Sequence, residues 1–189
     1  MIKFLDELTE QEIQALRIQT AKKPVLVVVH PHHNTGKNKA LDRFLKGKKW
    51  NKYIKIVTVG PTDAPPLIQH LGKIINPADE VYVVRTVKNN QPEPIMGWTK
   101  FKRILKELHA KRVLVSGRKL QEDSSEQARR MLEYQVEQKQ YRQAKQTARF
   151  LVAAKRMGST NTLGACAGYT ATKLAHSRDF RVKFVRKFT

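Results

Sequence analysis

The sequence predicts an α/β domain in which helices cover both faces of a mostly parallel sheet. Four short runs rich in Val, Ile and Leu recur along the first 120 residues, and segments of helical periodicity separate them. Strands that are apolar on both faces are typical of parallel sheets buried between two helical layers. Because crossovers between parallel strands are right-handed, we expect a doubly wound, Rossmann-like three-layer sandwich.

The strands of this sheet are expected where apolar and β-branched residues run together, at 25–29, 53–59, 80–84, 112–116 and 180–185. Apolar residues at helical spacing predict helices at 4–20, 38–46, 65–75, 99–109 and 166–176. Thr9 and Glu12 have the spacing of a capping box, so the first helix could break near Thr9. Residues 89–94 hold two prolines and are expected to form a loop.

A helical insertion is predicted between the fourth strand and the helix that starts at Cys166. Residues 123–157 contain neither Gly nor Pro and are rich in Gln, Glu, Arg, Lys and Ala. This composition is typical of one long helix or of a helical hairpin. We therefore expect a single domain over residues 1–189, with residues 121–158 inserted into it.

The composition limits the class of protein. Hydrophobic residues make up 40% of the 189, which is enough for a core. No apolar run approaches the roughly 20 residues that cross a bilayer, and the first residues lack the apolar centre of a signal peptide. The single cysteine excludes an intramolecular disulfide. We expect a soluble cytoplasmic protein without a membrane partner or a cofactor, and a homo-oligomer is compatible with the sequence.

The net charge is the clearest functional signal. Lys and Arg number 37 against 16 Asp and Glu, which gives +21. Residues 1–20 carry two basic and four acidic groups, whereas residues 139–189 carry 12 basic groups and one acid, a net charge of +11. Such an uneven distribution favours a polyanionic partner, either nucleic acid (RNA or DNA) or a ribonucleoprotein. A basic protein without such a partner is the alternative.

Two clusters of cations are the candidate nucleic-acid-binding residues. One belongs to a basic block that runs from Lys22 to Lys55, and the other lies in the insertion, where Tyr134, Tyr141 and Phe150 are interleaved. Basic residues with aromatic neighbours bind backbone and stack bases, although an ordinary solvated helix has a similar pattern. The candidates are Lys37, Lys39, Arg43, Lys46, Lys48, Lys49, Arg142, Lys145, Arg149, Lys155 and Arg156.

The loop after the first predicted strand has two further features. Gly36 and Lys37 resemble part of a phosphate-binding loop, but the leading Gly and the Ser/Thr that holds magnesium are missing. Three histidines, His30, His32 and His33, could bind a metal or form a solvated loop or phosphate contact. No carboxylate accompanies them nearby, so we expect no metal site.

Cys166 is the candidate nucleophile. It follows Gly164 and Ala165 and starts a predicted helix, where the helix dipole lowers the pKa of a thiol. A small buried apolar side chain is the alternative role of a lone cysteine.

A family resemblance adds to this interpretation. Residues 113–117 form a strand that ends in Gly, Cys166-Ala-Gly-Tyr-Thr-Ala171 follows at a helix start, and 181–185 form a last strand. This pattern resembles the isochorismatase-like cysteine hydrolases, which include nicotinamidases. The resemblance implies that Cys166 is the nucleophile, that Lys88, or less favourably Arg85, is its cationic partner, and that small amides are the substrates.

The chain departs from that family at the catalytic base. The family has an aspartate at the end of the first strand, where this chain has His30. A histidine can deprotonate a thiol, so His30 is the candidate base of an altered mechanism. Two functions follow: a nucleic-acid-binding or ribonucleoprotein-binding protein on a hydrolase-like scaffold, or a cysteine hydrolase that acts through Cys166, Lys88 and His30.

Overall fold

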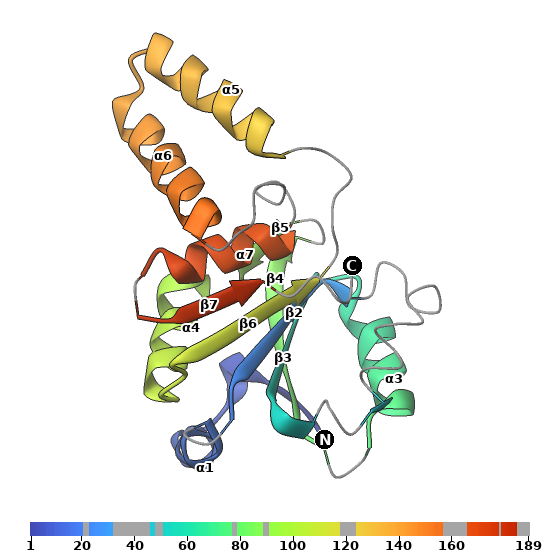
Figure 1. Cartoon of the computed structure of the whole chain (residues 1–189). Helices are drawn as coiled ribbons and strands as arrows, with labels where there is room; N and C mark the ends of the chain where they lie inside the picture. Colours follow the sequence, from blue (N-terminus) through green and yellow to red (C-terminus); the bar gives the residue numbers. More distant parts are fainter. Residues whose placement is uncertain are drawn as a thin grey trace.

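A seven-stranded sheet forms the centre of the molecule (Figure 1). The computed structural model describes residues 1–20, 23–31, 46–47, 51–76, 79–88, 91–117, 124–156, 166–177 and 179–184. The strands are β1 (Ile2–Phe4), β2 (Val25–Val29), β3 (Ile54–Val59), β4 (Val81–Lys88), β5 (Gln91–Pro94), β6 (Arg112–Gly117) and β7 (Arg181–Phe184). Six of them lie in the order β1-β4-β3-β2-β6-β7, with every neighbouring pair parallel, and β5 pairs antiparallel with β4.

Helices cover both faces of this sheet. They are α1 (Glu10–Thr20), α3 (Ala64–Ile74), α4 (Gly97–Glu107), α5 (Ser124–Glu137), α6 (Tyr141–Arg156) and α7 (Cys166–Ala175), and a short 3₁₀ helix spans Leu5–Glu7. Side chains of α1, α4 and α7 join one core cluster, and side chains of α3 join a second cluster on the other face. The predicted fold, an α/β three-layer sandwich of the Rossmann-like kind, is confirmed.

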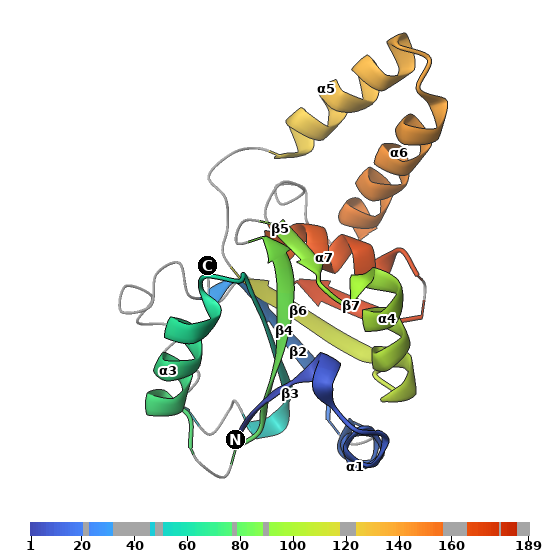
Figure 2. The same ribbon diagram turned by 180° about the vertical axis from the view of Figure 1, so that it is seen from behind.

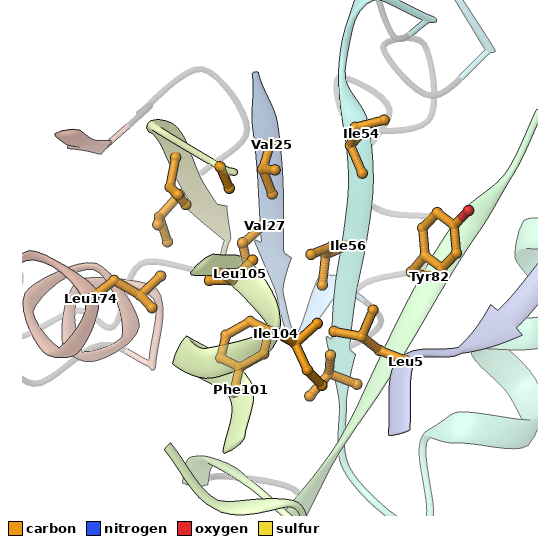
Figure 3. Close-up of a cluster of buried hydrophobic side chains, with 14 of the residues drawn as sticks. Leu5, Val25, Val27, Ile54, Ile56, Tyr82, Phe101, Ile104, Leu105 and Leu174 are labelled. Carbon is orange, nitrogen blue, oxygen red and sulfur yellow. The ribbon is translucent and has the colours of Figure 1, made fainter. Parts of the chain in front are cut away.

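The larger core cluster explains why these segments fold as they do. Alternate residues of the central strands, such as Val25 and Val27, point into it and meet Phe101 and Leu105 of α4 (Figure 3). All four are at most 1% exposed. The intervening residues point to the opposite face, where Leu26 packs in the cluster with α3. Because both faces of each central strand are buried, the strands appear in the sequence as continuous apolar runs.

The strand order defines a switch point at the carboxyl edge of the sheet. From β2 the chain proceeds outward through β3 and β4, and it then returns to the other side of β2 as β6. The connections on the two sides of β2 therefore diverge at the carboxyl ends of β2 and β6. Ligands of doubly wound proteins bind at such a crevice.

Two strands occur in segments for which the sequence predicts a helix or a loop. The helix expected over residues 4–20 starts at Glu10, and Ile2–Phe4 form β1, which pairs with β4 at the edge of the sheet. Residues 91–94, expected in a loop, form β5. Its two prolines are tolerated because this short strand pairs only with β4 among the described strands. The predicted capping box is confirmed, since the Thr9 N–H donates to Glu12 Oε2 at 3.0 Å and the Glu12 N–H donates to Thr9 Oγ1 at 3.3 Å.

The predicted insertion contains a helical hairpin, which we call the arm and define as residues 124–156. Its helices α5 and α6 pack on each other and project away from the sheet in both views (Figures 1 and 2). Ala144 is buried between them, and the Thr147 hydroxyl donates to Gln135 Oε1 at 2.8 Å. Lys139 adopts a positive φ of 54° in the turn. Across the described residues, no helix is long and apolar enough to cross a membrane.

Candidate nucleic-acid interface

Many acidic groups form ion pairs within the chain. Arg85 donates to Asp6 and Glu7, and its bond to Glu7 measures 2.8 Å. Lys3 lies 3.1 Å from Glu12 and 3.5 Å from Glu80. The remaining described pairs are Lys55–Asp79, Arg103–Glu107 and Lys106–Asp179. These acids neutralise the cations beside them, so other cations dominate the charge that a partner meets.

Lys55, the last lysine of the basic block that starts at Lys22, is buried. It lies in β3 with its side chain only 5% exposed, and its Nζ is 2.9 Å from Asp79 Oδ1. Burial lowers the pKa of Lys55, and the bond to Asp79 acts against that effect. A buried and paired ammonium group stabilises the fold and does not contact a polyanion.

The arm presents a row of exposed cations. Arg142, Lys145 and Arg149 of α6 are separated by three and four residues, so they lie on one face of the helix. All three are exposed, and within the described part of the chain none of them forms an ion pair. The opposite face holds the buried Ala144. We call these three cations the arm row.

Two tyrosines of the arm are exposed together with the arm row. Tyr134 of α5 is 56% exposed, and Tyr141 at the start of α6 is 66% exposed. Large apolar side chains at a surface mark interaction sites when they gather. Aromatic rings near cations match the pattern of surfaces that stack bases.

A second set of cations lines a groove at the amino end of the sheet. The groove has a volume of about 720 Å³. We call it the basic groove, and its lining consists of Lys23, Pro24, Lys52, Tyr53, Arg112, Leu114, Arg181, Val182 and Lys183. Five of these residues are cations and none is acidic. No ion pair among the described residues involves the five cations.

The structure describes only some of the other candidate cations. Lys46 is described and exposed, whereas Lys37, Lys39, Arg43, Lys48 and Lys49 lie outside the described residues. The predicted helix over 38–46 is likewise described only at Lys46. Lys155 and Arg156 belong to α6, and their side chains are outside the described part. Arg112, Arg181 and Lys183 are groove residues that the sequence did not single out.

The candidate catalytic residues lie at the carboxyl edge, but at different places along it. His30 follows β2 and Cys166 starts α7. Gly117, at the end of β6, lies between the end of β2 and the start of α7. A Cβ at this position would collide with the Val29 oxygen and touch Ala167. Lys88 is exposed at the end of β4, the second strand from β2 in the order of the sheet.

His30 is held in a defined position beside the switch point. It adopts a positive φ of 46° and is 2% exposed. Its backbone N–H donates to Thr58 O at 3.1 Å, and its Nε2 lies 3.4 Å from Thr86 Oγ1. His30 therefore reaches across to β4, where the Thr86 hydroxyl that it contacts donates to the Lys88 carbonyl at 2.9 Å. Among the described residues, no group of three His, Cys, Asp or Glu could hold a metal ion.

Comparisons with known proteins leave the family open. No family model, no curated protein and no solved structure matches the chain.

Proposed function

We propose that the protein binds nucleic acid through exposed cations that form no ion pair among the described residues. The observation that carries this proposal is the arm row: Arg142, Lys145 and Arg149 share one exposed helix face without an ion pair among the described residues. Such cations neutralise phosphates and release condensed counterions, which supplies most of the affinity of sequence-independent binding.

The position of the arm supports the same proposal. It projects from the sheet (Figure 2), so its outer faces point away from the sheet and the helices that cover it. The exposed Tyr134 and Tyr141 add ring faces on which unpaired bases could stack. RNA, DNA and the nucleic acid of a ribonucleoprotein share this phosphate chemistry. We place the activity in the cytoplasm, where a chain with a single cysteine keeps its thiol reduced.

The test compares two variants that each lose three positive charges. The arm variant carries Arg142→Gln, Lys145→Gln and Arg149→Gln. The matched control carries Lys3→Gln, Arg103→Gln and Lys106→Gln, whose side chains form ion pairs within the chain. We expect the arm variant to bind a fluorescent RNA or DNA oligonucleotide about tenfold or more weakly in about 0.1 M salt, with the control close to wild type.

Two results would reject the proposal. The first is that the full chain binds neither RNA nor DNA even at low salt. The second is that the control loses as much affinity as the arm variant, because net charge alone would then explain the binding.

A second candidate function is the hydrolysis of a small amide by Cys166. The observation that favours it is that α7 starts at Cys166 and its next residue, Ala167, lies against Gly117 at the carboxyl end of β6, which pairs with β2 at the switch point. A nucleophilic thiol reacts with iodoacetamide well below the pH at which an ordinary cysteine reacts. Mass spectrometry of the treated protein at pH 7 tests this, and a Cys166 that resists alkylation argues against the hydrolase.

A further inference from the structure

We infer that the basic groove holds successive phosphates of a single nucleic-acid strand. This inference rests on the proposed nucleic-acid binding and assigns it a second site, at the opposite end of the sheet from the arm. The groove lies where the parallel strands begin, since Arg112 and Arg181 are the first residues of β6 and β7. The arm instead joins the chain after the carboxyl end of β6.

The register of the strands brings the groove cations together. Arg112 pairs with Arg181, and Leu114 pairs with Lys183, so these four side chains share one face of the sheet. It is the face on which Leu114 packs toward the α3 cluster. Lys23 and Lys52 precede β2 and β3 and complete the groove from the neighbouring strands.

Like charges this close repel one another unless an anion lies between them. Among the described lining residues, no carboxylate fills that role. Asp79 and Glu80 line an adjoining pocket together with Lys23, and they form ion pairs with Lys55 and Lys3. A ligand with several negative charges would relieve the repulsion, and a phosphate backbone supplies them at regular intervals.

The dimensions favour one strand over a duplex. The groove volume of about 720 Å³ is within the range of pockets that enclose a small molecule, so a segment of one strand can enter it, whereas a double helix would lie across its mouth. A single strand can place consecutive phosphates against the cations. Its sugars and bases can then contact the apolar part of the lining, which consists of Pro24, Tyr53, Leu114 and Val182.

The test uses a groove variant with Arg112→Gln, Arg181→Gln and Lys183→Gln in the full chain. All three side chains are exposed, so we expect its melting temperature to match that of the wild type. For a single-stranded oligonucleotide in about 0.1 M salt, we expect at least about tenfold weaker binding. The slope of log K against log salt is expected to fall in magnitude by about 2, because three phosphate contacts are lost. A duplex of the same length is expected to lose less affinity.

Acetylation of lysines in the bound and free protein gives a second measurement on the unaltered chain. Bound single strand is expected to protect Lys23, Lys52 and Lys183, while the exposed Lys73 on α3 reacts as before. If these lysines stay reactive and the groove variant keeps wild-type affinity and slope, the inference is overturned while the proposed function stands. If the duplex loses as much affinity as the single strand, the assignment to a single strand is wrong. If the wild type binds no nucleic acid, the proposed function fails first.

Discussion

The N-terminal side of the molecule and the arm contain the same kinds of cation in opposite circumstances. Near the N-terminus, Lys3 and Arg85 each contact two carboxylates. On the arm, Arg142 and Lys145 are exposed and form no ion pair among the described residues. The difference shows that the net charge of +21 combines two kinds of cation, those paired with carboxylates of the chain and those without such a pair among the described residues. Carboxylates of the chain partly neutralise the paired cations, so we expect the other cations to bind a polyanion more strongly.

The largest expected effect on stability comes from removing a buried, paired cation, and an exposed groove cation provides the comparison. Lys55→Ala removes one partner of the Lys55–Asp79 pair and leaves a carboxylate that is only 16% exposed. We expect the free energy of unfolding to fall by about 3 kcal/mol, measured by urea denaturation. Lys183→Ala is the matched control in the groove and should change it by less than about 0.5 kcal/mol. Equal losses for the two variants would abolish the distinction between paired and available cations.

A smaller loss of stability is expected at Arg85. Arg85→Gln removes the bonds to Asp6 and Glu7 and the stacking of the guanidinium over the Phe4 ring, 4.7 Å from its centroid. These contacts fix β1 and the 3₁₀ helix to β4, and we expect a loss of about 1 to 2 kcal/mol. Oligonucleotide affinity should be unchanged, and a tenfold loss would mean that paired cations also bind the partner.

The smallest effect is a pH dependence at Glu12. The N–H of Thr9 and the ammonium of Lys3 hold the pKa of Glu12 below its usual value. A carboxyl with a lowered folded-state pKa stabilises the fold above its unfolded pKa, about 4.3, and loses that contribution as the pH falls through the folded value. Glu12→Gln should therefore lower the melting temperature slightly at pH 7. The wild type and the variant should converge once the pH falls below the lowered folded-state pKa of Glu12, and a difference that persists there would contradict the assignment.

The central fold could be predicted because its strands are buried on both faces. β2 reads Val-Leu-Val-Val-Val, and the other central strands are almost as apolar, so only helices on both sides can cover them. β1 could not be predicted, because the spacing of Phe4, Leu5 and Leu8 also fits a helix. Its three residues become a strand only through pairing with β4, which is distant in sequence.

The candidate interface could be predicted only where the periodicity of one helix places its cations on the same face. The arm row follows from the spacing of Arg142, Lys145 and Arg149 on a helix. The basic groove depends on which strands are neighbours, and the sequence does not specify that β7 lies beside β6. The pairing of Lys55 could not be predicted for the same reason, since Asp79 reaches it from outside its own strand.

The salt dependence of the affinity of the full chain for a single-stranded oligonucleotide tests the central claim most directly. The arm row and the basic groove together offer eight cations, three on α6 and five in the groove. If most of them contact phosphates, log K falls linearly with log salt, with a slope of about −5. A slope near zero, or no binding at low salt, would contradict the claim that these cations serve a nucleic-acid backbone.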